Sequence, residues 1–322
     1  MIRNKTIFLV KAWLLTFVLS LLSQPLLSQP EVVRIAALKG PTGLGMIKLF
    51  QEKPTLDSGV RTEYVAYPSP DVVIPRLVNG EIDLAALPAN VAVNLYNKKI
   101  PYVLAAIIGN GVLYCISTDP TVKNLETLDR IQNVAKGSTP EFILRHILEV
   151  KGLKDKVKVE FRYAPVELAQ LLIAGREKTG VLPEPFATKV LRARPDARII
   201  SDLQEEWRAF YPDTPTYPMT ALVVKASFLR TYRPLIDSFL SLYRDSQEWV
   251  KKHPEEAGIL ASQLSLGIER EDAKDAIPRC NLTFVPAKEA RPVVEQFLKI
   301  LLQFAPESIG GKLPDSEFYA VP

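Results

Sequence analysis

Cysteine and histidine are scarce in this sequence of 322 residues, which contains two of each. A structural zinc site needs four nitrogen or sulfur ligands, and Cys115 and Cys280 are too far apart to have metal-ligand spacing. His146 falls among apolar residues of an expected helix, and His253 precedes a proline. We therefore expect neither a metal site nor a histidine-based catalytic site. A disulfide between Cys115 and Cys280 stays possible in an exported protein, and two free buried thiols are the alternative.

Several sequence motifs of enzymes and nucleic-acid-binding proteins are also missing. Lys39-Gly40-Pro41-Thr42-Gly43 is not followed by the Gly-Lys-Ser/Thr of a P-loop, which disfavours nucleotide hydrolysis. Nothing resembles a nucleophile elbow or a two-histidine zinc helix, although a site assembled from distant residues would leave no local motif. The 40 basic residues are scattered and balanced by 36 acidic ones, so nucleic-acid binding is not expected. We expect no cofactor and no catalytic residues.

The first 28 residues are typical of a secretory signal peptide. Three basic residues and no acidic one occur in this segment, and the apolar run Ala12–Leu22 is short for a membrane-spanning helix. Ser23 or Ser28 offers a small residue for cleavage. A retained membrane anchor is the alternative, because apolar residues resume at Leu26. No cysteine lies near the cleavage region, so a lipoprotein anchor is not expected, and the predicted location is periplasmic or extracellular.

Strand and helix patterns alternate through the first two thirds of the remaining chain. Short apolar runs such as Val33–Leu38 and Ile82–Ala86 are separated by single helical patterns such as Pro70–Val78. This alternation indicates βαβ units and a largely parallel sheet. The last third, by contrast, is rich in helical patterns and is expected to pack back on the first part of the chain.

Two short motifs occur twice in the same order, which predicts two lobes of similar topology. The repeated pairs are Leu38-Lys39-Gly40-Pro41-Thr42 with Ala135-Lys136-Gly137-Ser138-Thr139, and Gly80, Leu87, Pro88, Ala92 with Gly175, Leu182, Pro183, Ala187. Chance similarity of turn residues is the alternative. We predict an α/β fold with residues 29–117 and 219–322 in a discontinuous first lobe and residues 118–218 in the second. The chain is expected to cross between the lobes near Ser117 and near Pro218.

The candidate binding residues lie where predicted strands end, because ligands of open α/β sheets bind outside the carboxyl ends of the strands. The loops Lys39–Gly45 and Lys136–Pro140 lead directly into helix N-termini, whose free N–H groups and dipole favour anionic or polar groups. Glycine allows close backbone approach, and hydroxyl groups donate hydrogen bonds. The predicted ligand-binding residues are Lys39, Thr42, Gly43, Pro88, Asn90, Asn110, Gly137, Ser138, Thr139, Glu184 and Tyr217.

Several of these residues also have a purely structural interpretation. Ser138 and Glu141 fit a capping box, and Asn90 is suited to capping the helix that follows Pro88. Glu184 is a candidate for binding an amine or a heterocyclic N–H, and a solvated loop acid is equally compatible with the sequence. Tyr217 is expected either in an apolar wall of the site or as a half-buried structural residue.

Four segments resemble the periplasmic solute-binding proteins of the taurine, alkanesulfonate and nitrate type, which include thiamine-precursor (NMT1-like) binders. The segments are Asn79-Gly-Glu-Ile-Asp-Leu-Ala-Ala, Val134-Ala-Lys-Gly-Ser-Thr, Val181-Leu-Pro-Glu-Pro-Phe-Ala, and the tail Leu222–Leu260 with its His253-Pro-Glu-Glu-Ala. The resemblance covers nearly all of residues 31–322. It implies a type II-like, two-lobed periplasmic binding protein fold, each lobe a mixed, mostly parallel sheet flanked by helices, with two hinge crossings.

The resemblance also implies ligand contacts by position, at Gly43, Asn90, Ser138, Thr139 and Glu184. The sequence departs from the family at Lys178-Thr179-Gly180, where many members carry an acid before the strand. The cysteine-rich motif of the fungal pyrimidine-forming relatives is missing, which argues against that enzyme activity.

The expected function is the extracytoplasmic solute-binding subunit of an ABC importer. Such a protein captures a small polar molecule, such as a sulfonate, an anion or a small heterocycle, between two closing lobes. The expected partners are this ligand and the permease subunits at the membrane, and a monomer is expected. The alternatives are an enzyme on the same fold, similar to menaquinone-pathway lyases or hydrolases, and a ligand-sensing subunit.

Overall fold

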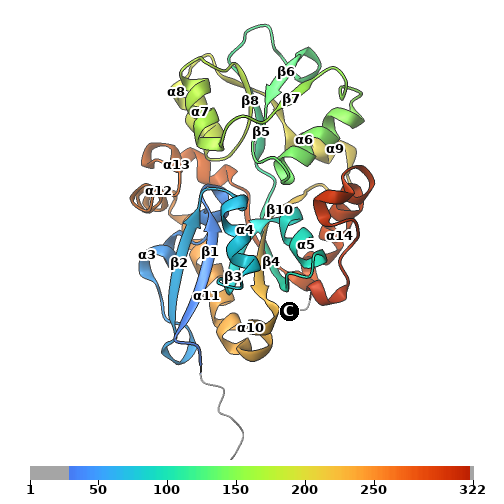
Figure 1. Cartoon of the computed structure of the whole chain (residues 1–322). Helices are drawn as coiled ribbons and strands as arrows, with labels where there is room; N and C mark the ends of the chain where they lie inside the picture. Colours follow the sequence, from blue (N-terminus) through green and yellow to red (C-terminus); the bar gives the residue numbers. More distant parts are fainter. Residues whose placement is uncertain (1–28, 320–322) are drawn as a thin grey trace, which may run out of the picture. The chain divides into compact units, whose positions relative to one another are not determined.

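The computed structural model describes residues 29–319, so the predicted leader and its cleavage site lie outside the described residues. Within this range, no helix combines the length and apolarity needed to cross a membrane. From Glu31 onward the chain forms two lobes, each built on its own β-sheet with helices packed on it (Figure 1). The prediction of a two-lobed α/β fold is confirmed.

The first lobe contains a mixed sheet of six strands in the order β11-β4-β10-β3-β1-β2. The strands are β1 (Val32–Leu38), β2 (Arg61–Tyr67), β3 (Leu84–Pro88), β4 (Tyr102–Asn110), β10 (Pro218–Lys225) and β11 (Leu282–Pro286). β1 pairs in parallel with β2 and β3, whereas β10 pairs antiparallel with β3 and β4. The central strands are buried on both faces, which explains their continuous apolar sequences, and only β2 at the edge alternates with exposed residues.

The second lobe repeats the arrangement with five strands in the order β7-β6-β8-β5-β9. They are β5 (Leu113–Ser117), β6 (Arg130–Gln132), β7 (Lys158–Glu160), β8 (Thr179–Pro183) and β9 (Arg198–Asp202). β6 pairs in parallel with β7 and β8, and β5 pairs antiparallel with β8 and β9. Thus β6, β7 and β8 correspond to β1, β2 and β3. The loops that follow β1 and β6 are the two loops with repeated sequence.

The helices cover both faces of each sheet (Figure 1). Those of the first lobe are α2 (Pro41–Leu44), α3 (Ile47–Glu52), α4 (Pro70–Val78), α5 (Ala89–Asn97), α10 (Ala226–Thr231), α11 (Arg233–Lys252), α12 (Pro254–Gln263), α13 (Arg270–Ala276) and α14 (Ala287–Phe304). Those of the second lobe are α6 (Thr139–Val150), α7 (Pro165–Ile173), α8 (Phe186–Ala193) and α9 (Leu203–Phe210). The tail from β10 onward packs on the first lobe, as the sequence predicts.

The first crossing between the lobes lies earlier than the expected boundary near Ser117. β5 already belongs to the second sheet, so the chain crosses at Gly111–Val112. The return segment ends at Pro218, where β10 begins. The two crossings run side by side, because the backbone N–H of Gly111 donates to the carbonyl of Tyr217 at 3.1 Å. Gly109-Asn110-Gly111 interrupts the apolar sequence between β4 and β5, and this break coincides with the crossing.

The disulfide between Cys115 and Cys280 is not formed. Both cysteines are free and buried. Cys115 lies in β5 of the second lobe, whereas Cys280 follows the short helix Ile277–Arg279 in the first lobe, and the two belong to different apolar clusters. Burial raises the pKa of both thiols, so they are packing residues rather than reactive ones.

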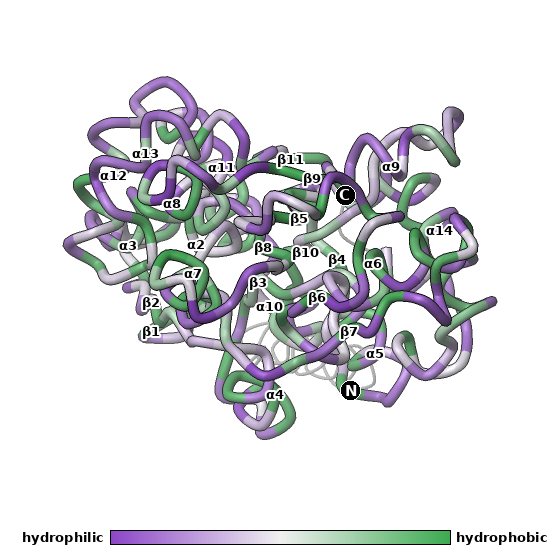
Figure 2. Tube along the Cα trace, turned by 90° about the horizontal axis from the view of Figure 1, so that it is seen from above, coloured by the Kyte–Doolittle hydropathy of each residue, from purple (hydrophilic) through white to green (hydrophobic). Residues whose placement is uncertain are grey.

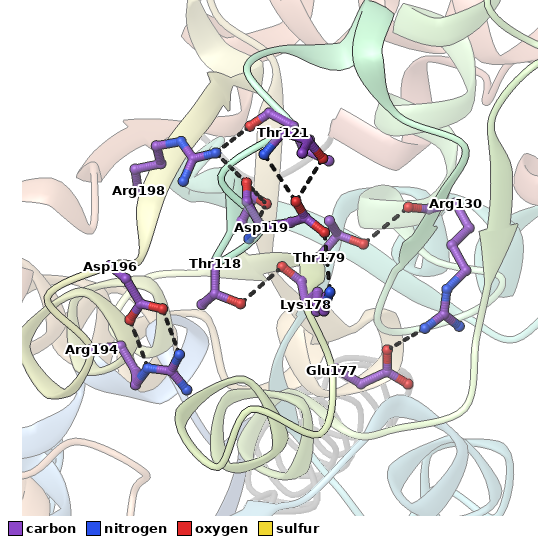
Figure 3. A network of polar contacts seen from close by, with 12 residues as sticks. Thr118, Asp119, Thr121, Arg130, Glu177, Lys178, Thr179, Arg194, Asp196 and Arg198 are labelled. Atoms are coloured by element: carbon purple, nitrogen blue, oxygen red, sulfur yellow. Dashed lines mark hydrogen bonds and ion pairs between the residues drawn. The ribbon is translucent and has the colours of Figure 1, made fainter.

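A polar network occupies the end of the second lobe that carries the N-terminus of β8 (Figure 3). Asp119 accepts hydrogen bonds from the hydroxyl and the backbone N–H of Thr121, at 2.6 and 2.9 Å, and lies 3.3 Å from Lys178 Nζ. These contacts, led by the Thr121 hydroxyl, lower the pKa of Asp119 to about 2. Lys178, at the position where the sequence departs from its relatives, therefore belongs to a structural network. It lies at the opposite end of β8 from Pro183.

Candidate functional site

A cleft with a volume of about 440 Å³ lies between the lobes at the carboxyl ends of the parallel strands. Its lining comes from the ends of β1, β3 and β8, the loop after β6, the start of β10, and the N-terminal parts of α2, α4, α5, α6, α7 and α8. Most of these residues are apolar, and seven are prolines. Proline is favoured in the first turn of a helix, and four of the seven, Pro41, Pro70, Pro140 and Pro165, occupy that position in helices that begin here. A cleft lined by both lobes and by several helix N-termini is suited to a small molecule with a polar head and an apolar body.

The first lobe contributes the loop after β1. The backbone N–H of Lys39 donates to the carbonyl of Tyr67, and that of Gly40 to the carbonyl of Leu266, at 2.9 and 2.8 Å. Gly40 has a φ of 90°, in the region that favours glycine. These contacts hold Lys39 and Thr42 in the lining of the cleft.

The second lobe contributes the matching loop after β6. Gly137 has a φ of 76°, and its N–H donates to a carboxylate oxygen of Glu141 at 2.8 Å. Ser138 is the N-cap of α6, but its side chain makes no capping hydrogen bond. Glu141 therefore stabilises the loop one residue earlier than a capping box would, and Ser138 lines the cleft without serving as a side-chain cap.

Two lysines occupy equivalent positions in these loops, one in each lobe. Lys39 and Lys136 both line the cleft and are exposed to solvent. Neither side chain has an ion-pair or hydrogen-bond partner among residues 29–319. The one carboxylate in the lining, Asp71, is exposed near the start of α4. The cleft thus presents two unneutralised positive charges from opposite lobes.

Asn90 and Thr139, two predicted ligand-binding residues, instead connect the lobes to each other. The hydroxyl of Thr139 donates to Asn90 Oδ1 at 3.0 Å, and Asn90 Nδ2 donates to the carbonyl of Gly137 at 3.1 Å. Asn90 Nδ2 also lies 3.4 Å from the carbonyl of Ser308. Both side chains are fully buried. Their hydrogen-bonding capacity is used within the protein, and neither lines the cleft.

Glu184 is neither in the lining of the cleft nor exposed in a loop. It is 0% exposed, and its Oε1 lies 2.9 Å from the guanidinium of Arg279 in the first lobe. Its other oxygen accepts a hydrogen bond from the N–H of Thr188 at 3.0 Å. Burial raises the pKa of Glu184, and the charge of Arg279 partly offsets this effect. Glu184 therefore forms a buried ion pair between the lobes.

The remaining predicted residues divide between the cleft and other parts of the structure. Pro88 and Gly137 line the cleft. Gly43 packs against the carbonyl of Leu38, where a Cβ would lie 2.8 Å from the oxygen, and Tyr217 is fully buried against Trp207 and Phe297. Asn110 lines a different pocket near the crossings. Of the predicted set, those that line the cleft are Lys39, Thr42, Pro88, Gly137 and Ser138.

Phe186 is the largest side chain of the cleft that sequence reasoning missed. It begins α8 of the second lobe, and its ring lies against Gly40 and Gly267 of the first lobe. A Cβ on either glycine would lie 3.3 or 3.2 Å from the ring, and both glycines have a φ of 90°. Phe186 therefore fits into a socket made by two glycines. Lys136 was also missed, although its match to Lys39 in the repeated motif is a signal that identifies it.

Several solved structures are similar to this chain. A crystal structure described as an ABC transporter from Parabacteroides distasonis has a TM-score of 0.76 and 26% identity, covering 91% of this chain and 99% of the other. The periplasmic aliphatic sulphonate binding protein SsuA from Escherichia coli has a TM-score of 0.67 and 15% identity, with coverage of 88% and 96%. The periplasmic nitrate-binding protein NrtA from Synechocystis PCC 6803 has a TM-score of 0.67 and 13% identity, with coverage of 91% and 85%. At such low identities, the last two show a shared fold.

The fold is thus that of the two-lobed periplasmic binding proteins. A family model described as the NMT1-like family matches residues 47–265, about two thirds of the sequence, and the chain belongs to this family. The resemblance seen in the sequence is confirmed. The sequence matches none of the curated proteins with which it was compared.

Proposed function

We propose that this protein is the exported solute-binding subunit of an ABC importer and captures a small molecule in the cleft between its lobes. The observation that carries the proposal is the pair Lys39 and Lys136, which face the cleft from opposite lobes without ion-pair partners among residues 29–319. A ligand that contacts both charges bridges the lobes and favours the closed form, because it interacts with both at once only when they are close together. The similar structure described as an ABC transporter from Parabacteroides distasonis supports this role.

The lining favours a ligand with a negatively charged or strongly polar group and an apolar part. The two lysines and the hydroxyls of Thr42 and Ser138 supply donors, and Leu38 and Phe186 are among the apolar residues around them. A sulfonate, another small anion or a small polar heterocycle meets these requirements. Glu184 does not contribute to ligand choice, because its carboxylate is committed to Arg279.

A binding role is favoured over catalysis by the composition of the lining. The residues that line the cleft include no histidine or cysteine, and Asp71 is its one carboxylic acid. A general acid–base reaction needs a titratable group with a pKa near the working pH, held close to the substrate. Periplasmic or extracellular location and docking to membrane permease subunits follow from the proposed role.

Calorimetric titration of the exported, purified protein tests the proposal. The ligands are an alkanesulfonate, nitrate and an aminopyrimidine, and native mass spectrometry detects any molecule that co-purifies. We expect at least one ligand to bind, and Lys136→Ala to weaken it at least about tenfold, since a charge-assisted contact is lost. Lys178→Ala, which lies just before β8 at the end away from the cleft, is the matched control and should bind the ligand with unchanged affinity. Absence of binding to every ligand, together with no co-purified molecule, would overturn the proposal.

A further inference from the structure

Phe186 is shared between three surfaces of the protein. Its ring lines the cleft, belongs to a buried apolar cluster of the second lobe, and lies against Gly40 and Gly267 of the first lobe. The residue is only 3% exposed. We call the two glycines the Phe186 socket. Neither glycine lines the cleft, so a molecule bound there meets the ring but not the socket.

The socket is built entirely within the first lobe. Gly40 lies in the loop after β1 and Gly267 in the loop after α12. The N–H of Gly40 donates to the carbonyl of Leu266 at 2.8 Å, which joins the two loops. The N–H of Leu266 donates in turn to the carbonyl of Ala261 at 2.9 Å, which ties the second loop to α12. None of these bonds involves the second lobe, so the socket keeps its shape when the lobes separate.

Glycine is required at both positions of the socket for the ring to lie this close. A Cβ on Gly40 would lie 3.3 Å from Cε2 of Phe186, and a Cβ on Gly267 would lie 3.2 Å from Cζ and 3.4 Å from Cε1. These distances are shorter than the optimal separation of two carbon atoms, about 3.5–4.0 Å. Both glycines also have a φ of 90°, which a side chain would strain. Space and backbone conformation therefore impose the same requirement twice.

We propose that Phe186 is a positioning residue, which couples closure of the lobes to ligand binding by entering the glycine socket. The ring moves with the second lobe and the socket with the first, so a rotation at the crossings withdraws one from the other. Withdrawal exposes apolar surface of the ring and opens the cleft wall between Phe186 and the loop after β1. The seated ring therefore stabilises the closed arrangement.

A ligand with an apolar part meets the complete cleft wall only when the ring is seated. The role in ligand affinity rests on the proposed function of the cleft. The closing contact itself does not, because the ring and the socket meet whatever the cleft binds.

Gly267→Ala tests the contact and leaves the lining of the cleft unchanged. The added methyl group lies against the ring and should keep it out of the socket. Gly59→Ala is the matched control, because Gly59 has a φ of 80° and a Cβ there would meet nothing within 4 Å. The control variant thus carries similar backbone strain without the contact. Phe186→Ala, alone and combined with Gly267→Ala, completes a double-mutant cycle in which the methyl group has no ring to meet.

Small-angle X-ray scattering of the unliganded proteins reports the arrangement of the lobes. We expect Gly267→Ala to have a larger radius of gyration than the wild type, and Gly59→Ala to match the wild type. Phe186→Ala and the double variant should match each other. This readout needs no ligand, so it is unaffected if the proposed function fails. Equal radii for the wild type and Gly267→Ala, or a further increase from Phe186→Ala to the double variant, would overturn the inference.

Calorimetric titration with 1-hexanesulfonate, whose tail is apolar, measures the effect on binding. Gly267→Ala should weaken binding at least about fivefold, because the apparent affinity falls with the fraction of protein that can close. Gly59→Ala should bind with unchanged affinity. A wild type that binds this probe no better than Gly267→Ala, with a larger radius of gyration in the variant, would separate closure from binding and overturn the coupling.

Discussion

The two lobes meet on both sides of the cleft, through charged groups on one side and through apolar and amide groups on the other. On the charged side, α8 faces α13 and the residues after it, with ion pairs at Glu184–Arg279, Lys189–Glu269, Arg192–Asp272 and Arg192–Asp275. The trace of α13 is largely hydrophilic there (Figure 2). On the apolar side, α6 and α9 face α5 and α14 (Figure 1).

The apolar side continues the hydrophobic core from one lobe into the other. Trp207 of α9 and Phe297 of α14 contact Tyr217 in the second crossing, at ring-centroid distances of 5.3 and 6.5 Å. The ring of His146 stacks on Phe304 at 4.8 Å and lies 2.5 Å from the hydroxyl of Tyr211. Trp207, Tyr217 and Phe297 belong to one buried cluster that includes strands of both sheets, and Tyr211 and Phe304 pack against it.

The comparison shows that one side of the cleft depends on salt concentration and the other does not. Ion pairs between exposed groups weaken with salt, whereas packed rings and amide hydrogen bonds are insensitive to it. Lys189 and Arg192 are partly exposed, so their ion pairs contribute little. The strength of the charged side therefore rests mainly on the buried pair Glu184–Arg279.

The largest effect is expected from breaking this buried pair. Arg279→Met leaves the Glu184 carboxylate without its counter-charge at a site with no exposure, and should lower the free energy of unfolding by about 3–5 kcal/mol. The double variant Glu184→Gln/Arg279→Met carries no buried charge and should recover most of the loss. Urea denaturation of the three proteins measures both effects. If Arg279→Met were as stable as the wild type, the Glu184 carboxylate would have to be hydrated in solution.

A smaller effect is expected from the matching contact on the apolar side. Asn90→Ala removes the hydrogen bonds to Thr139 and Gly137, leaves a buried hydroxyl unpaired, and should lower the free energy of unfolding by about 1–3 kcal/mol. The loss should be the same at low and high salt, because no charge is involved. Denaturation at two ionic strengths checks this. A marked salt dependence of the loss would contradict the distinction between the two sides.

The smallest effects are opposite pH dependences of the two sides. Burial raises the pKa of Glu184 above its ordinary value of 4.5, so the folded state holds this proton more tightly and stability is lost as the pH rises from 4.5 through the folded pKa. Burial lowers the pKa of His146 below 6.5, so stability is lost as the pH falls from 6.5 through its folded pKa. For each group, the free energy of unfolding changes by at most about 1.4 kcal/mol per pH unit.

Unfolding of Glu184→Gln and His146→Gln over a pH series separates these slopes. The stability difference between wild type and Glu184→Gln should fall as the pH rises, and that between wild type and His146→Gln should rise. If both stability differences changed in the same direction as the pH rises, burial could not be raising the pKa of Glu184 and lowering that of His146.

Repeated sequence did not always produce repeated structure. The loop after β1 leads into α2, which has four residues, whereas the matching loop after β6 leads into α6, which has twelve. Gly43 and Gly45 let the segment after β1 pack closely on β1 and on Tyr243. The close packing of these glycines interrupts the helix, so α2 is short. α6 has no glycine and continues. Both loops nevertheless place a lysine in the cleft.

The elements that sequence reasoning missed have weak local patterns. β9 and α9 follow the turn at Pro195 and Asp196, and α13 is a short helix of mostly charged residues. α13 is held by contacts with α12 and α8 rather than by an apolar stripe of its own. Such elements form because tertiary contacts stabilise them, which a periodicity argument cannot detect.

The sequence by itself determined the α/β lobes, their repetition and the loops around the cleft, because apolar periodicity and turn residues are local properties. Only the tertiary structure decided which polar residues of those loops face the cleft. Lys39 and Ser138 line it, whereas Asn90, Thr139 and Glu184 are satisfied by partners in the opposite lobe. The physical reason is that burial and hydrogen-bond partners depend on a surface far away in the chain. No local pattern around these residues encodes that surface.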